Sequence, residues 1–158
     1  MHSRAATFVE RARETHGFEP SVEELPEGTK TAADAAEAID CDVGQIASSL
    51  AFDVEGSLVV SVTSGANRVS EAALGNHFDA SPENVSMADP ERIKGVLGWS
   101  IGGVPPFCHD ESVPVVIDES LLEYETVWAA AGTPEAVFPI GPETLREYAE
   151  ATPVRVTG

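Results

Sequence analysis

Apolar residues recur at helical spacing in several parts of the chain. The clearest example is the alanine-rich segment 32–39, where apolar residues occupy positions i, i+3, i+4 and i+7 behind Thr31, a residue that can cap a helix. Asp89 and Pro90 form a favourable N-cap and first-turn pair ahead of another apolar face. The segments predicted to be helical are residues 3–15, 32–39, 70–74, 90–97 and 142–149.

Alternating apolar and polar residues predict strands between these helices. In residues 46–54, every second side chain from Leu50 to Val54 is apolar and is expected to point inward. Glu55 and Gly56 would then turn the chain back on itself. The further strand candidates are residues 18–25, 57–63, 113–117, 126–131, 136–140 and 153–156, of which the first would lie at a sheet edge.

Short connections between the predicted strands indicate the type of sheet. Parallel neighbours need a crossover of about a dozen residues, whereas antiparallel neighbours can be joined by a tight turn. This chain interleaves helices with strands but also has several short turns. We therefore expect one domain over residues 1–158 of the α/β (α+β) class, with helices around a mixed, largely antiparallel, barrel-like sheet.

Composition supports a folded domain away from membranes. Hydrophobic residues make up 42% of the chain, which is enough for a sizeable core. No apolar run approaches the roughly 20 residues that span a bilayer. The N-terminal segment also lacks the apolar stretch of a secretory signal. We expect a cytoplasmic protein that does not contact a membrane.

An excess of acidic residues is the strongest compositional signal. Asp and Glu total 27 against 9 Lys and Arg, so the formal net charge is −18. Such a surface repels itself at ordinary ionic strength, but the Debye length falls to about 3 Å in 1 M salt. We therefore predict a halophilic protein, with an acidic mesophilic protein as the alternative. Because nucleic-acid-binding proteins normally carry a basic patch, the charge alone argues against a nucleic-acid partner.

The sequence shows no metal or cofactor motif. Cys41 and Cys108 are too few for a disulfide framework or a structural zinc site, and the four histidines lack metal-ligand spacing. There is no Walker loop and no GxGxxG fingerprint. We expect neither a metal nor an organic cofactor.

The stretch GWSIGGVPPFCHDES, residues 98–112, is the strongest local candidate for a binding site. Its two adjacent glycines allow backbone N–H groups to approach a ligand closely, and its two prolines stiffen the loop. Such a loop can bind an anion, a carbonyl oxygen or a developing oxyanion. A tight packing turn would use the same residue types, so the pattern by itself leaves both interpretations open.

Four motifs occur in a characteristic order: TAADAAEAI…VGQIASSLAF, SVTSGANRVS, GWSIGGVPPFCH and VWAAAGTPEAVFPIGPETLREY. Over residues 3–156 the chain resembles the YbaK/prolyl-tRNA-synthetase-associated editing domain family. The resemblance implies an α/β fold around a mixed, barrel-like sheet, and hydrolysis of the ester that links a wrong amino acid to tRNA. It implies no metal or organic cofactor. It also makes tRNA the expected partner despite the acidic composition, and it favours the binding interpretation of the loop.

The resemblance further implies part of the site, and polar residues near the same motifs supply the other candidates. The loop from Gly102 to Pro106 would hold the substrate carbonyl with its amides while water attacks the ester. The catalytic candidates are Ser48, Gly102, Gly103 and His109, and the substrate-binding candidates are Ser49, Ser64, Gly65, Asn67, Arg68, Val104, Pro105, Pro106, Ala131, Gly132 and Thr133.

Two positions depart from the family pattern. Family members typically carry a lysine in QI-x-KSL-x-F, where this chain has Ser48, whose hydroxyl has no charge. Some members have a serine where this chain has Ala130, so the pocket wall would be less polar. Three interpretations stay open: a deacylase that works through water, the loop amides and the substrate's own groups; a paralogue that binds an aminoacyl-like ligand without hydrolysis; and an unrelated use of the fold.

Several candidates also have a structural alternative. Cys108 and His109 are adjacent on an extended segment, so they point to opposite sides and cannot form a dyad with each other. His109 would either act on a ligand, as a base or a hydrogen-bonding group, or bond to the backbone. The polar residues of 64–68 would either face the pocket or close a turn. The helix that carries Arg92 and Lys94 is the expected tRNA-facing edge.

Overall fold

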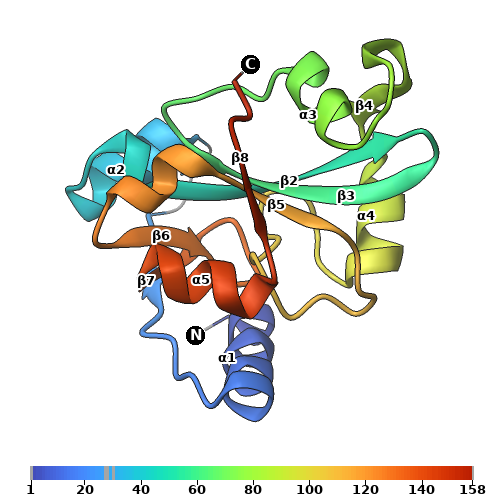
Figure 1. Cartoon of the computed structure of the whole chain (residues 1–158). Helices are drawn as coiled ribbons and strands as arrows, with labels where there is room; N and C mark the ends of the chain where they lie inside the picture. The colour runs from blue at the N-terminus through green and yellow to red at the C-terminus, as the bar shows by residue number, and fades with distance from the viewer. Residues whose placement is uncertain (1, 27–28, 30, 158) are drawn as a thin grey trace.

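Eight strands form one mixed sheet in the computed structural model, which describes residues 2–26, 29 and 31–157 (Figure 1). Neighbouring strands follow the order β1, β7, β6, β2, β3, β5, β8, and β4 pairs with β2 outside this path. The strands are β1 (Glu23–Glu24), β2 (Ile46–Val54), β3 (Ser57–Ser64), β4 (Val85–Met87), β5 (Val115–Asp118), β6 (Val127–Ala130), β7 (Ala136–Ile140) and β8 (Thr152–Val154).

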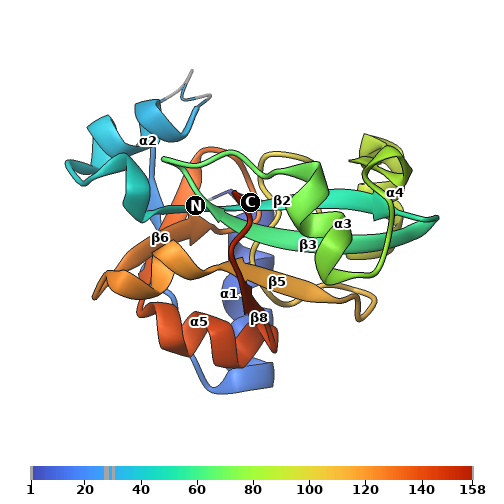
Figure 2. The same cartoon turned by 45° about the horizontal axis from the view of Figure 1, so that its top comes forward.

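The sheet is mixed and largely antiparallel, as predicted. The β1–β7, β6–β7, β2–β3 and β2–β4 pairs are antiparallel, whereas the β2–β6, β3–β5 and β5–β8 pairs are parallel. In the part of the chain that is described, no ladder joins the two end strands β1 and β8, so the barrel-like sheet does not close. Figure 2 shows the sheet from a second direction, with helices on both sides of it.

Five α-helices surround the sheet in the described residues, and four of them begin at a side-chain cap, for example at Thr31 and Asp89. The Thr31 hydroxyl accepts the N–H of Asp34 at 3.0 Å, and Asp89 accepts the N–H of Glu91 at 2.9 Å. The helices are α1 (Ser3–His16), α2 (Ala32–Ile39), α3 (Glu71–His77), α4 (Pro90–Leu97) and α5 (Pro142–Ala149), with short 3-10 turns at Val43–Gln45, Pro82–Asn84 and Glu119–Glu123. In the described ranges, none of these helices combines the length and the apolar composition needed to cross a bilayer.

β2 is the middle strand of the sheet order, and both of its faces are covered. Ala47 and Ala51 belong to the main hydrophobic core, which also takes residues from α1, α4, α5 and β3. Phe52 and Val54 belong to a second cluster that includes Leu74 of α3. Phe52 and Val54 point inward, as predicted from the alternating pattern. Leu50, the first residue of that pattern, is only half-buried.

Trp99 connects α1 to the segment that follows α4. Its indole is fully buried and meets Phe8 of α1 edge-to-face, with 6.2 Å between the ring centroids. The Arg4 guanidinium lies 4.3 Å from the centre of the same indole. The indole N–H donates to the Cys108 carbonyl at 3.0 Å. The loop of residues 98–108 is therefore held both by α1 and across its own span.

The sequence predictions differ from the structure mainly in short elements. β4 was not predicted because three residues are too few to show alternation, and it exists because it pairs with Phe52–Val54 of β2. The edge strand expected within residues 18–25 contracts to the two residues of β1. The helix expected to end near Leu74 continues to His77.

Candidate functional site

The edge of β2 that faces away from β3 has a gap. β6 pairs with this edge at Ile46 and Ala47, and β4 pairs with it from Phe52 to Val54. Between them, residues 48–51 have no paired strand on this side in the described chain. A cavity of about 260 Å³ lies at this gap.

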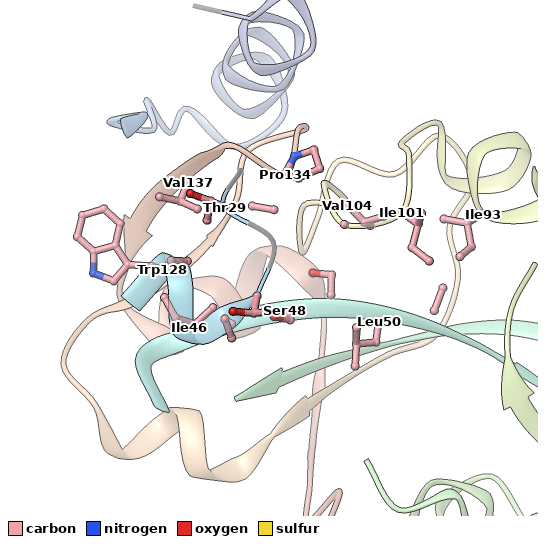
Figure 3. A pocket seen from close by; sticks show the side chains of 18 of the residues that line it. Thr29, Ile46, Ser48, Leu50, Ile93, Ile101, Val104, Trp128, Pro134 and Val137 are labelled. Atoms are coloured by element: carbon pink, nitrogen blue, oxygen red, sulfur yellow. The ribbon is translucent and has the colours of Figure 1, made fainter. Parts of the chain in front are cut away.

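Segments that are far apart in the sequence enclose the cavity. Figure 3 shows Ser48 and Leu50 on β2, Trp128 and Val137 towards one end, and Ile93 towards the other. The residues that line it are Thr29, Thr31, Ala32, Ala35, Ile46, Ala47, Ser48, Ser49, Leu50, Ala51, Met87, Ile93, Ile101, Gly102, Val104, Trp128, Ala130, Pro134 and Val137. The polar side-chain groups of this lining are four hydroxyls and the Trp128 N–H, and no described lining residue is acidic or basic.

The predicted loop turns sharply at Gly102. The N–H of Gly103 donates to the Ser100 carbonyl at 3.0 Å and closes a turn whose third residue, Gly102, has φ +88°. This left-handed conformation is open mainly to glycine. The Gly103 amide is used in this turn, whereas the amides of Gly102 and Val104 make no backbone hydrogen bond in the described chain, and both of these residues line the cavity.

The segment 131–134 supports this loop from behind. A Cβ at Gly103 would lie 2.6 Å from Cα of Thr133, so the two backbones are in direct contact. Gly132, with φ +97°, leaves room for Trp99, whose ring would lie 2.7 Å from an added Cβ. Ala131, Gly132 and Thr133 were predicted to bind substrate, but the structure places their flanking residues, Ala130 and Pro134, in the cavity lining instead.

His109 is not brought into the cavity. Its Nε2 lies 2.8 Å from the carbonyl of Pro105, and because a carbonyl only accepts, Nε2 carries the proton. The ring borders a separate hollow, together with Pro106. Burial lowers the pKa of His109, although the bond to Pro105 and the nearby Asp110 partly oppose this shift. This arrangement matches the backbone-bonding alternative and makes His109 a support of the loop.

Cys108 is equally unsuited to attack a substrate. It has φ +66°, and burial raises the pKa of its thiol to about 11. The thiolate is the nucleophilic form, so the side chain stays protonated and unreactive near neutral pH.

The turn after β3 forms a network of its own around Asp118. This buried carboxylate accepts the N–H of Ser64 at 3.1 Å and the side-chain amide of Asn67 at 2.9 Å. The Ser64 hydroxyl donates to the Gly44 carbonyl at 2.8 Å, and an added Cβ at Gly65 would lie 2.6 Å from a backbone oxygen. The predicted binding residues Ser64, Gly65 and Asn67 therefore hold the turn together and do not line the cavity, which corresponds to the turn-closing alternative.

The expected tRNA-facing helix α4 has one of its two cations engaged. Arg92 forms an ion pair with Asp53 at 2.5 Å and donates to the Gly56 carbonyl at 2.6 Å. Lys94 is exposed on the same helix, and Arg68 is exposed in the turn after β3. The structure therefore leaves Lys94 as the cation of α4 that can meet a partner.

Comparison with known proteins decides the family. A family model described as "Aminoacyl-tRNA editing domain" matches residues 26–148. The chain belongs to the aminoacyl-tRNA editing domain family. A curated relative, the uncharacterised protein YwhH of Bacillus subtilis, is 30% identical over 135 residues, which cover 82% of each chain. The proline–tRNA ligase of Leuconostoc citreum is 27% identical over 127 residues, which are 80% of this chain but only 22% of that enzyme.

Solved structures agree with this editing fold. A crystal structure provisionally described as a trans-editing enzyme for prolyl tRNA synthetase superposes with a TM-score of 0.91 at 37% identity and covers 100% of this chain and 99% of that one. The hypothetical protein APE2540 shares the fold, with a TM-score of 0.80 at 22% identity over 93% of this chain and 98% of that one.

Sequence reasoning missed the apolar part of this editing-domain cavity. Met87 and Ile101 are the most exposed large apolar side chains in the described chain, at 53% and 50%, and both lie in the lining. An apolar residue inside a Gly-rich turn, as at Ile101, was the local signal available. Trp128 and Val137 reach the cavity only through strand pairing, which no local pattern reveals.

Proposed function

We propose that this editing domain hydrolyses the ester between an amino acid and tRNA. The observation that supports the proposal is the cavity at the β2 gap, which is lined mostly by apolar groups and includes Gly102 and Val104, two loop residues whose amides make no backbone hydrogen bond in the described chain. Its volume of about 260 Å³ is just below the range of about 300–1,000 Å³ for pockets that enclose drug-sized ligands. It therefore suits a small group such as the aminoacyl end of a charged tRNA.

The chemistry follows from the groups at hand. Water attacks the ester carbonyl carbon, and the loop amides stabilise the negative charge that develops on the carbonyl oxygen. The bond to the ribose oxygen then breaks, which releases the free amino acid. No described lining residue is a carboxylate or an imidazole. The proton lost by the water therefore passes to the ribose oxygen directly or through the neighbouring ribose hydroxyl.

A second candidate function is binding of an aminoacyl ligand without hydrolysis. The observation that favours it is Ser48, which lines the cavity at the position where the family typically has a lysine. A serine hydroxyl cannot supply the positive charge that a lysine would place there.

A deacylation assay in molar KCl tests the two candidates. Alanyl- and cysteinyl-tRNA(Pro) would be incubated with the wild-type chain, with Ser48→Lys, and with Ser57→Lys, which adds the same charge on the exposed hairpin. Turnover by the wild type supports the deacylase. Turnover only by Ser48→Lys supports the binding function, and equal gains in both lysine variants would mean that the added charge acts through the whole surface.

A further inference from the structure

Backbone direction along β2 follows from two hydrogen bonds. The Ile46 carbonyl accepts the N–H of Gly65, just beyond β3, so Ile46 directs its backbone groups towards β3. The Ala51 carbonyl accepts the N–H of Ala88, just beyond β4, so Ala51 directs its groups towards the opposite edge. Successive residues of a strand alternate in direction. Ser49, two residues before Ala51, therefore directs its N–H and C=O towards the edge with the gap.

Nothing in the described chain meets these backbone groups of Ser49. The β6 ladder reaches only to Ala47, and the β4 ladder begins at Phe52. An unpaired N–H and C=O at a strand edge form a template for an additional strand. At Ser49 this template lies in the wall of the cavity.

The side chain of Ser49 adds a second, independent observation. Its hydroxyl oxygen is buried without a hydrogen-bond partner, and no other described side chain has such an atom. Leaving a buried hydroxyl unpaired is costly, and such groups usually have a partner in the functional state. Ser49 thus has an unpaired N–H and C=O at the wall of the cavity, and beside them a buried hydroxyl that rotation about its Cα–Cβ bond can turn towards a ligand.

An aminoacyl group matches this arrangement atom by atom. Its N–Cα–C=O skeleton is that of one strand residue, so it can pair with a strand edge as a strand residue does. Its ammonium only donates, and both the Ser49 carbonyl and hydroxyl can accept. Its ester carbonyl only accepts, and the Ser49 N–H can donate.

We propose that Ser49 binds the α-ammonium group of the aminoacyl ester through its carbonyl and hydroxyl oxygens, so that the substrate occupies the place of the missing strand residue between β6 and β4. This inference rests on the proposed function, because it assigns a role within the same cavity. It makes the free α-amine a requirement for binding. Ser49 would be a substrate-binding residue, and its N–H would share the ester carbonyl oxygen with the loop amides.

Binding of non-hydrolysable analogues tests the inference separately from catalysis. Three probes would be titrated calorimetrically into the full chain in molar KCl: adenosine with an amide-linked 3′-alanyl group, its N-acetyl derivative, and the 3′-lactyl amide, in which a hydroxyl replaces the amine. A hydrogen bond to a charged group predicts that the alanyl probe binds about tenfold or more tightly than either of the others.

Two variants test whether the preference for the alanyl probe depends on Ser49. Ser49→Ala should weaken binding of the alanyl probe by only about threefold to tenfold, because the backbone carbonyl remains as an acceptor for the ammonium. Binding of the lactyl probe should be nearly unchanged. Ser57→Ala, on the exposed hairpin, should bind all three like the wild type. Equal affinity of the three probes, or no binding of any, would overturn the inference. A preserved alanyl preference without ester turnover would uphold it while refuting the proposed hydrolysis.

Discussion

Gly102 in the loop and Gly95 in the preceding helix α4 have different structural roles. Gly102 has φ +88°, and an added Cβ would lie 3.4 Å from Pro134. Gly95 lies within α4, and an added Cβ there would meet nothing within 4 Å. The first glycine shapes the loop at the cavity, whereas the second only lowers the helix propensity of α4.

Gly102→Ala should lower kcat/KM for deacylation about tenfold or more. Alanine at this φ costs roughly 1–2 kcal/mol, so the loop shifts and its amides leave the position for the carbonyl oxygen. Gly95→Ala is the matched control and should raise the free energy of unfolding by about 0.5–1 kcal/mol. Urea denaturation and steady-state kinetics on both variants check this, and equal activity of the two would contradict the role given to Gly102.

His109 should make stability depend on pH in the weakly acidic range. Its pKa is lowered in the folded state from the ordinary value of 6.5, so the unfolded chain binds the proton more readily. The stability that His109 contributes to the folded state is complete above about pH 6.5 and is lost as the pH falls towards the folded-state pKa. His109→Gln keeps a donor for Pro105 and should flatten this dependence. A residual slope is expected from His16, whose pKa burial also lowers. An unchanged pH profile of unfolding would contradict the assignment.

Elements position the cavity through a few anchor residues. The segment after α4 is held against α1 by Trp99, and its glycine backbone rests on the turn between β6 and β7. Gly103 meets Thr133 there, and Gly132 meets the Trp99 ring. The loop therefore depends on packing with elements that are distant in the chain, about 90 residues away for α1 and about 30 for the turn between β6 and β7.

Trp99→Leu should lower the free energy of unfolding by about 2–3 kcal/mol, because a smaller side chain leaves a cavity and the Cys108 carbonyl loses the nearer of its two donors, the other being Arg11 at 3.5 Å. The matched change, Trp128→Leu, alters a half-buried residue and should cost roughly 1 kcal/mol. Urea denaturation in molar KCl measures both. A larger loss for Trp128 would show that the α1 contact is not the main anchor.

Charge is the property that belongs to the whole molecule. The net charge is −18, and ion pairs within the fold occupy Arg11, Arg13, Arg92 and Arg146. Arg4 is held by Trp99 and the Gly98 carbonyl. Among the described residues few cations are left for tRNA phosphates, so we expect recognition to rely on the cavity and on hydrogen bonds.

The melting temperature should rise between dilute buffer and molar KCl. Salt screens the repulsion among the 27 acidic side chains. Melting curves in KCl, with sucrose of matched viscosity as a control, measure this effect. The same melting temperature at both salt concentrations would contradict a halophilic adaptation.

Local patterns determined much of this protein. Helix starts at Thr31 and Asp89, the Glu55-Gly56 turn and the stiff loop at Gly102 depend on neighbouring residues, so the sequence alone predicts them. Composition likewise determined the net charge of −18.

Only the tertiary structure decided what faces the cavity. Whether His109 reaches a ligand or Pro105, and whether Asn67 faces the pocket or Asp118, depends on contacts with other elements. The gap at Ser49 exists because β6 and β4, from distant parts of the chain, each pair with only part of one β2 edge. A gap of this kind is a property of strand pairing, and no periodicity within residues 46–54 can encode it.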